Sequence, residues 1–391
     1  LHPLLENALA KTLGVPLFQE QLMQIAIDVA NFTPADADML RQAMGSKRSR
    51  ERMDDLKARF FDGMRTNGIT DDIGEQIWLK LAAFSNYGFP ESHSVSFSYL
   101  VYASSWIKYH YPAAFCAALL KAQPMGFWSP HTLVGDARRH GVVVRTPDLN
   151  RSASTATLEP CEGSTGSVSV RLGFDYVRGI GLDLAEEIDA GRPFASVEDL
   201  RRRVPSLSLA HLEALATAGA FGCFGIDRRS ALWAAGAVSQ TSADRLPGIV
   251  TGVEAPTLPG MSPQELSHAD LWATGVAPDG HPTSFIRGDL TERGVVTATD
   301  LADMASGERV LVGGVVTHRQ RPATAQGTTF LNLEDETGLI NVVVSKGCWQ
   351  RYKQIARGAP ALLIRGRLEK EEGVINICLL YTSPSPRDDE L

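Results

Sequence analysis

The sequence is poor in cysteine: five are scattered over 391 residues, and none has CxxC or CxH spacing. This pattern argues against a disulfide framework and against a zinc site, and it indicates reduced cytoplasmic thiols. No window approaches the roughly 18 continuous apolar residues of a membrane span, and no signal peptide is visible. We therefore expect a cytoplasmic protein without a membrane partner. The chain opens at Leu1 rather than at a methionine, which we interpret as the middle of a domain.

The chain also lacks an excess of positive charge, because its formal net charge is −7. This is only a weak objection to nucleic-acid binding, which needs local basic surface rather than a global excess. Between Arg41 and Arg65, eight Lys or Arg stand against four Asp or Glu, a local balance of +4. A solvated helix face explains such a run equally well.

The length and the hydrophobic content of 44% are ordinary for a globular protein of two or three domains. Apolar residues at helical spacing predict an all-helical region from Leu1 to about Met125. We expect a short helix and a strand over 134–150, a loop over 152–168 and a compact helical segment over 172–235. Residues 240–280 are rich in Pro, Gly, Ser and Thr, which predicts a linker with short helices.

After Arg309 the hydrophobic period changes to that of strands. Five segments qualify as strands: VLVGGVV, TTFLNLE, LINVVVS, ALLIRGR and VINI. A helical run from Gly347 to Ala356 separates the third from the fourth. Three strands, a helix and two strands is the element order of an OB-fold barrel.

A glycine-rich turn over residues 174–181, FDYVRGIG, fits a helix-hairpin-helix. Gly179 and Gly181, after Arg178, allow a tight backbone turn, and the next helix then presents N–H groups to a phosphate. Such a site reads the DNA backbone rather than its sequence. An ordinary helix–helix turn is the alternative. The segment LEALATAGAFG, which contains Gly219, resembles a second and degenerate copy.

The predicted barrel offers a second candidate surface. Leu331 and Leu333 alternate inward, so Phe330 and Asn332 are expected on the opposite face, where Asn341 joins them. An aromatic ring there stacks on a single-stranded base, although Phe330 packing against a neighbouring domain is an equal alternative. The segment His318-Arg319-Gln320-Arg321 is expected to form the loop between the first two strands, with Arg319 and Arg321 contacting DNA.

Arg41 and Lys47, in LRQAMGSKR, are candidates for neutralising a triphosphate. Asp36 and Asp38 resemble a metal-binding pair, but residues two apart on a helix point to nearly opposite faces. We interpret them as first-turn acids that favour the helix N-terminus. The nine His show no metal-ligand spacing, and only His93 is a functional candidate. The sequence therefore predicts no catalytic residue and no metal site on this chain.

Several long segments resemble bacterial C-family replicative DNA polymerases, the DNA polymerase III alpha subunits. They are GVPLFQEQLMQIA, LRQAMGSKR, YGFPESHSVSFSYLVYASSWIKYHYPAAFCAALL, RLGFDYVRGIGLDLAEEI, LEALATAGAFGCFG and RVLVGGVVTHRQRPATAQGTTFLNLEDETGLINVVV. The resemblance runs from about Gly14 to Ile377. QPMGF at 123–127 and HRQRP before the second strand are similar to the error-prone, damage-inducible branch, which implies translesion synthesis and induced mutagenesis.

This resemblance implies a multidomain α+β fold with all-helical fingers, a helix-hairpin-helix module and a five-stranded OB-fold β-barrel. The expected domains are partial fingers at 1–170, the tandem helix-hairpin-helix at 171–238, a linker with short helices at 239–304 and the OB domain at 305–377. The last segment, 378–391, reads CLLYTSPSPRDDEL and resembles a translated cloning adaptor, so we expect a non-native tail there.

The resemblance also implies roles for residues. Arg41 and Lys47 contact the triphosphate of the incoming deoxynucleotide, and Ser92 and His93 lie where the fingers approach DNA. The palm with its catalytic aspartates has no counterpart here, so the full-length DNA-directed DNA polymerase uses Mg²⁺ held outside this chain and the fragment alone is inactive.

The implied partners are primer–template DNA, single-stranded template, dNTP, a sliding clamp and accessory mutagenesis proteins. Two other hypotheses stay open at this point. One is a non-enzymatic repair adaptor that combines the hairpins with the OB-fold, and the other is an RNA-binding OB module on a helical domain.

Overall fold

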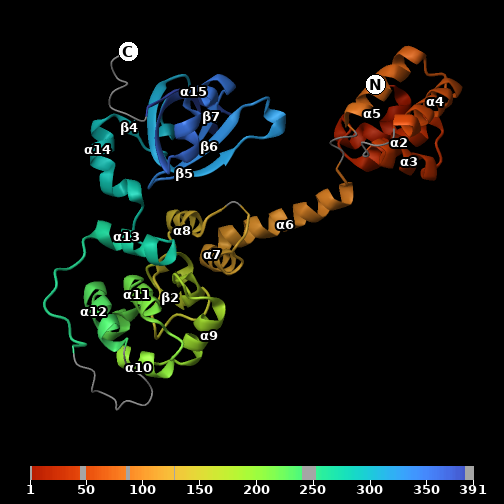
Figure 1. The fold of residues 1–391 in the computed structure, drawn as a ribbon. Helices are drawn as coiled ribbons and strands as arrows, with labels where there is room; N and C mark the ends of the chain where they lie inside the picture. The colour runs from red at the N-terminus through yellow and green to blue at the C-terminus, as the bar shows by residue number, and fades with distance from the viewer. Residues whose placement is uncertain (1, 45–49, 85–88, 127, 240–251, 384–391) are drawn as a thin grey trace. The chain divides into compact units, whose positions relative to one another are not determined.

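A computed structural model describes residues 2–44, 50–84, 89–126, 128–239 and 252–383 (Figure 1). The chain divides into two compact units, Leu1–Trp106 and Ile107–Leu391, which are described separately.

The first unit is a helical domain. Its helices are η1 (Pro3–Leu5), α1 (Glu6–Leu9), η2 (Ala10–Thr12), α2 (Gln19–Ala30), α3 (Pro34–Met44), α4 (Arg50–Thr66), α5 (Asp71–Phe84) and the start of α6 (Glu91–His110). Phe60 lies at the centre of the core, with its ring 5.7 Å from that of Phe32 and 5.4 Å from that of Trp78. One isolated bridge joins Phe18 to Phe89. The described part of 1–125 is otherwise helical, as predicted.

The start of α3 follows directly from its sequence. The Thr33 hydroxyl accepts a hydrogen bond from Asp36 N, and the Asp36 carboxylate accepts one from Thr33 N. This reciprocal pair satisfies backbone donors at the helix N-terminus, and Pro34 fits the first helical position.

The second unit begins with the last residues of α6 and continues with α7 (Pro112–Lys121) and α8 (Pro130–Arg139). A three-stranded sheet in the order β1-β3-β2 follows. Its strands are β1 (Val144–Arg145), β2 (Thr157–Pro160) and β3 (Val168–Arg171), with η3 (Thr165–Ser167) between the last two. The prediction of a loop over 152–168 is therefore wrong in part. Strand β2 pairs with β3, and Glu159 on β2 holds the buried Arg171 guanidinium at 2.6 Å.

The helical segment that follows contains η4 (Phe174–Tyr176), α9 (Leu182–Ala190), α10 (Val197–Arg203), α11 (Leu209–Thr217), η5 (Ala220–Phe224) and α12 (Arg228–Val238). They enclose one hydrophobic core, which includes Phe174, Leu200 and Phe221. Helix α13 (Pro263–Thr274) falls in the predicted linker but packs against α11. Its Asp270 is buried and pairs with Arg228 of α12 at 2.6 Å.

A short connection leads from α13 into the barrel. It contains η6 (Pro282–Ile286), α14 (Arg287–Glu292), β4 (Val295–Val296) and η7 (Asp300–Ala302). Strand β4 pairs in parallel with the first long strand of the barrel, so the sheet begins within the segment predicted as linker.

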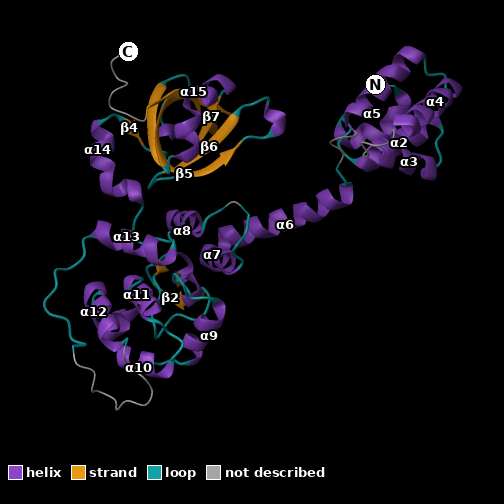
Figure 2. Ribbon diagram, in the orientation of Figure 1, coloured by secondary structure: helices purple, strands orange, loops and turns teal. Residues whose placement is uncertain are grey.

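The barrel has the predicted order of three strands, a helix and two strands. Its elements are β5 (Arg309–Gln320), η8 (Ala323–Ala325), β6 (Thr329–Glu334), β7 (Leu339–Val344), α15 (Lys346–Gly358), β8 (Ala361–Glu371) and β9 (Val374–Ser383). The sheet order β4-β5-β6-β7-β9-β8 closes on itself through β5–β8 pairing (Figure 2). The mixed α+β, multidomain fold class with a closed barrel is thus confirmed. Strand β9 continues past Ile377, so the first residues of the predicted tail pair with β8.

Candidate nucleic-acid interface

The first hairpin lies between η4 and α9. Gly179 has φ +81°, in the left-handed region that residues with a Cβ rarely adopt. Gly181 is the N-cap of α9 and offers no side chain to the N–H groups of the first helical turn. The buried side chains of Val177 and Ile180 anchor the turn to the core. The turn thus presents backbone donors in the arrangement that suits a phosphate.

Arg178 is exposed beside these glycines and is positioned by α13. Its guanidinium carbon lies 4.8 Å from the centroid of the Trp272 ring, and its backbone N–H donates to Ala273 O at 2.7 Å. Trp272 is half exposed. Sequence reasoning missed this contribution because α13 was assigned to a linker.

The second hairpin places Gly219 between α11 and η5 with φ +82°. A Cβ at this position would come within 3.0 Å of Arg228 Nε, in the guanidinium that pairs with the buried Asp270. Gly219 therefore satisfies a backbone requirement and also makes room for an internal ion pair.

The barrel face is arranged by strand alternation. Leu331 and Leu333 are 1% and 0% exposed, whereas Phe330 is 37% exposed. Asn332 donates from Nδ2 to Asn341 Oδ1 at 2.7 Å across the β6–β7 pair. An aromatic ring and two amides thus lie on neighbouring strands, a combination that can stack on and hydrogen-bond to an unpaired base.

The two arginines beyond this face differ in their surroundings. Arg319 Nε donates to Ala356 O at 2.8 Å, and its Nη2 donates to Ala359 O, at the C-terminal end of α15. Arg319 therefore holds the helix against the barrel. The prediction of a loop over 318–321 is wrong for the first three residues, because β5 extends to Gln320. Arg321 follows the strand and is exposed.

In the first unit, Arg41 is held by its own helix. Its Nη2 lies 2.8 Å from Asp38 Oδ1, and hydrogen bonds from Arg41 and Gln42 hold the pKa of Asp38 below its usual value. The Asp36 carboxylate instead accepts a hydrogen bond from the Thr33 hydroxyl and forms an ion pair with Arg59 at 2.8 Å. The two carboxylates therefore have separate partners and do not fit a shared metal pair.

The other predicted residues of this unit are more dispersed. Lys47 lies outside the described residues. Ser92 and His93 are exposed on α6, and the His93 ring lies 4.8 Å from that of Phe89 and 4.4 Å from that of Phe97. Among the described residues there is no group of three or more His, Cys, Asp or Glu that could hold a metal ion. No helix in the same residues is long and apolar enough to cross a membrane.

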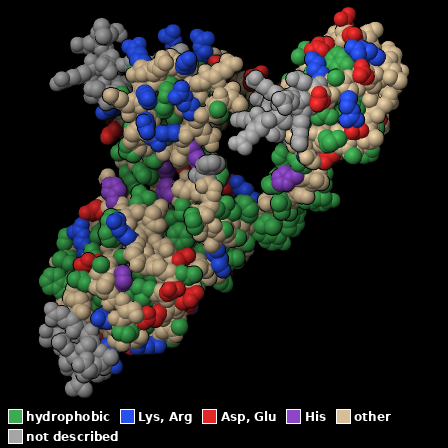
Figure 3. All heavy atoms as spheres, turned by 45° about the vertical axis from the view of Figure 1, so that its right-hand side comes forward, with side chains coloured by type: hydrophobic (Ala, Val, Ile, Leu, Met, Phe, Trp, Pro, Cys, Tyr) green, Lys and Arg blue, Asp and Glu red, His purple; other side chains and the backbone are tan. Residues whose placement is uncertain are grey.

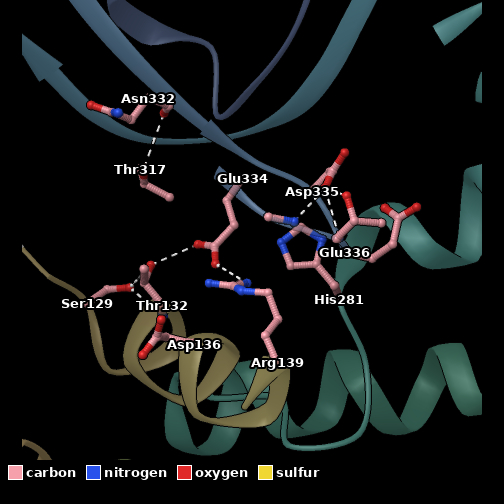
Figure 4. A network of polar contacts seen from close by, with 12 residues as sticks. Ser129, Thr132, Asp136, Arg139, His281, Thr317, Asn332, Glu334, Asp335 and Glu336 are labelled. Carbon is pink, nitrogen blue, oxygen red and sulfur yellow. Dashed lines mark hydrogen bonds and ion pairs between the residues drawn. The ribbon is translucent and has the colours of Figure 1, made fainter. Parts of the chain in front are cut away.

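The acidic turn Glu334–Glu336, which begins at the last residue of β6, joins the barrel to elements that precede it in the chain (Figure 4). Glu334 is 2% exposed and accepts hydrogen bonds from Thr132 Oγ1 at 2.9 Å and Arg139 Nη1 at 3.2 Å, both on α8. Glu336 is bound by Arg287 at 2.9 Å and by the Thr283 hydroxyl. The carboxylates of the three acids thus form hydrogen bonds and ion pairs within the protein.

His281 caps η6 beside this turn. Its Nδ1 accepts from Thr283 N at 3.3 Å, and its ring stacks on that of His131 at 5.7 Å. Burial lowers the pKa of His281 to about 4, helped by the nearby His131 and opposed by the acids of the turn. His281 is therefore neutral at physiological pH and serves as a hydrogen-bond acceptor. No local sequence pattern indicates this cluster, because its members come from three separate segments.

Two segments of the chain match known protein families. The bacterial DNA polymerase III alpha subunit finger domain matches residues 1–68, and a helix-hairpin-helix motif matches residues 141–231. The curated relatives carry the name error-prone DNA polymerase. Those of Mycolicibacterium paratuberculosis and Mycobacterium tuberculosis are each 57% identical over 381 residues, which are 96% of this chain and 34% of theirs. That of Corynebacterium glutamicum is 52% identical over 377 residues, again 96% of this chain and 35% of the relative.

The chain is thus similar over nearly all of its length to error-prone DNA polymerases, and its first residues match the finger domain of bacterial DNA polymerase III alpha subunits. It spans about one third of the length of the curated relatives it matches. The resemblance to the error-prone branch of this family is confirmed by the names of those relatives. A crystal structure of asparaginyl-tRNA synthetase from Pyrococcus horikoshii covers 23% of this chain and 21% of its own at 18% identity, with a TM-score of 0.21, which is too low to bear on function.

Proposed function

We propose that this chain binds DNA and the incoming deoxynucleotide within an error-prone, DNA-directed DNA polymerase that acts in translesion synthesis and damage-induced mutagenesis. The observation that carries the proposal is the 57% identity to error-prone DNA polymerases across 96% of the chain. A non-enzymatic adaptor is disfavoured because this identity begins in a polymerase finger domain.

Each proposed role matches one surface. The turn at Arg178, Gly179 and Gly181 binds backbone phosphates of primer–template DNA, and the second hairpin at Gly219 supports it. Phe330 and Asn332 receive unpaired template bases, with Arg321 beside them. Arg319 acts on DNA indirectly, because its guanidinium holds α15.

In the first unit, we assign Arg41 and Lys47 to the triphosphate of the incoming dNTP. Arg41 is pre-oriented by Asp38, and a bound triphosphate competes for the same guanidinium. Ser92 and His93 lie on the side that approaches DNA. We assign the Mg²⁺ ions, which activate and stabilise the transferring phosphate, to residues outside this chain, so the chain alone is inactive.

The proposed domains are fingers at 1–170, tandem hairpins at 171–238, a connecting segment at 239–304, the OB domain at 305–377 and a non-native tail at 378–391. The proposed setting is the cytoplasm, with a sliding clamp and accessory mutagenesis proteins as partners.

A segment exchange tests this function. Residues 1–377 replace the matching segment of the error-prone DNA polymerase of Mycobacterium tuberculosis, and primer extension is measured with the parent, the chimera and the fragment. We expect extension by the parent and the chimera and none by the fragment. A folded chimera that binds primer–template DNA but extends nothing would contradict the proposal, as would extension by the fragment alone.

A further inference from the structure

A pocket of about 380 Å³ lies on the barrel where α15 crosses the end of β5 and the start of β6. We call it the α15 pocket. The residues that line it include Arg319, Arg321, Thr329, Trp349, Lys353 and Arg357. Only Arg319 and Arg321 were candidates from the sequence, and Arg319 is occupied by backbone carbonyls of α15.

Two buried polar groups that line this pocket have no partner in the described part of the chain. Thr329 is 1% exposed and Trp349 is 8% exposed, and no described residue forms a hydrogen bond with the Thr329 hydroxyl or the Trp349 indole N–H. Buried polar groups are nearly always paired, so an unpaired donor beside a pocket indicates a missing acceptor. An indole N–H can only donate, and a hydroxyl can also donate. The missing group therefore carries acceptor oxygens.

The charges around the pocket are of one sign. Arg321, Lys353 and Arg357 are exposed, and among the described residues none of these three cations is in an ion pair. Residues 309–333 contain three Arg and no acid, and residues 339–368 contain six Lys or Arg and no acid. The acids between these segments are those of the acidic turn, which bind α8, η6 and α14. Figure 3 shows several Lys and Arg side chains on one face of the barrel.

The position of the pocket points to a nucleic-acid strand as the source of the anion. Thr329 faces the interior of the barrel at the pocket, and the next residue of β6 is the exposed Phe330. Consecutive strand residues are only about 3.3 Å apart along the strand, so a base on the Phe330 ring and a phosphate at the pocket fall within one short stretch of a nucleic-acid strand.

We propose that the α15 pocket binds a backbone phosphate of single-stranded DNA. The indole N–H of Trp349 and the hydroxyl of Thr329 donate to the phosphate oxygens, and Arg321, Lys353 and Arg357 neutralise its charge. This inference rests on the proposed function and deepens it, because it assigns the path of the template backbone over the barrel.

The experiment uses the full chain and fluorescein-labelled oligo(dT), with affinity measured by anisotropy at several salt concentrations. Thr329→Val keeps the shape of the side chain and removes its donor, whereas Trp349→Phe removes the indole N–H but also leaves a smaller ring in the core, so its affinity is measured per folded molecule. We expect about a tenfold loss of affinity from each. Lys353→Gln with Arg357→Gln should lower the salt slope by about one per cation removed. Arg309→Gln is the control, because it removes a similar charge at the opposite end of β5.

A second measurement follows the indole N–H resonance of Trp349 by ¹H–¹⁵N NMR, assigned through Trp349→Phe. We expect it to shift with oligo(dT) and, at higher concentration, with inorganic phosphate. A shift with phosphate but none with saturating oligo(dT) overturns the DNA strand as the source. An unmoved resonance, with pocket variants that bind oligo(dT) like the Arg309→Gln control, overturns the site itself.

The failure of the pocket is distinguishable from failure of the proposed function. If the pocket variants are unaffected while Gly179→Val still weakens duplex binding, the pocket is wrong and the function stands. If the unchanged chain binds neither duplex nor oligo(dT), both are wrong.

Discussion

The carboxylate of Glu334 joins the barrel to α8, because its Oε1 accepts a hydrogen bond from Arg139 Nη1 at 3.2 Å across 195 positions of sequence. Glu334 is almost fully buried and also accepts from Thr132. A buried carboxylate is tolerated only where donors replace its lost hydration. These contacts therefore hold the barrel in one orientation on α8.

Glu334→Gln tests this contact. Glutamine keeps an acceptor oxygen for Thr132 but loses the charge that attracts Arg139, so we expect a lower free energy of unfolding by about 1–3 kcal/mol. Urea unfolding followed by circular dichroism gives the value. Glu371→Gln, at an exposed position of β8, is the control and should change little. Equal stabilities of the two variants would contradict the assigned role.

The protonation of His281 predicts a loss of stability in acid. Its folded-state pKa of about 4 lies below the ordinary value of 6.5, so the unfolded chain takes up the proton first. Its contribution is fully present above pH 6.5 and is lost as pH falls to about 4, by at most about 3 kcal/mol. Protonation of Nδ1 also removes the acceptor of Thr283 N.

His281→Asn isolates this effect from the surrounding groups His131, Glu334, Asp335 and Glu336, which are the same in both proteins. Asparagine can still cap η6 but does not ionise. Urea unfolding between pH 7 and pH 4 should show a shallower decline for the variant. Parallel curves for the two proteins would exclude His281 as the titrating group.

Two ion pairs join α12 to α13, and we expect very different losses of stability when each is removed. Arg228–Asp270 is buried, with side-chain exposures of 13% and 4%, whereas Arg229–Glu265 is exposed at 30% and 50%. Asp270→Asn leaves a buried guanidinium without its counter-charge and should cost about 3–5 kcal/mol. Glu265→Gln, the matched control, should change the stability far less, because solvent screens an exposed ion pair. Thermal unfolding compares them, and similar losses would show that α13 is not anchored by Asp270.

Elements that depend on local interactions could be predicted from the sequence, whereas elements that depend on a distant partner could not. The barrel strands were predictable because Leu331 and Leu333 alternate with exposed residues, and the start of α3 was predictable because Thr33 and Pro34 act locally. Residues 240–280 were predicted as a linker with short helices because of their Pro, Gly, Ser and Thr content. The packing of α13 could not be foreseen, because the partner that makes burial of Asp270 favourable is 42 positions away.

The residues of the candidate site also fall into two groups, those with a local sequence pattern and those whose partners are distant in sequence. Gly179 and Gly219 were recognisable because a left-handed turn has a local sequence pattern. Arg319 was assigned to DNA because its pattern is that of an exposed loop, but its acceptors lie 37 and 40 positions further along the chain. The orphan donor of Trp349 could not be foreseen, because an apolar ring on a helix predicts only core packing.

Gly179→Val tests the first hairpin. A β-branched residue at φ +81° is strained, so we expect a stability loss of about 1–3 kcal/mol and weaker binding of duplex DNA per folded molecule. The chain should remain folded, because the buried anchors Val177 and Ile180 are unchanged. Gly179→Asn is the control, since asparagine tolerates the left-handed region better. Anisotropy with a labelled duplex measures the affinity, and an unaltered value in a folded Val variant would count against the site.

Phe330→Ala separates base stacking from packing on the barrel. If a base stacks on the ring, the affinity for single-stranded DNA should fall by about 1–3 kcal/mol while the barrel stays folded, because the ring is already 37% exposed. Phe330→Leu is the matched control: it retains apolar contact with the sheet but has no aromatic face. Anisotropy with oligo(dT) should therefore show a loss in both variants. A loss of stability in Phe330→Ala, with unaltered affinity per folded molecule, would instead assign Phe330 to packing.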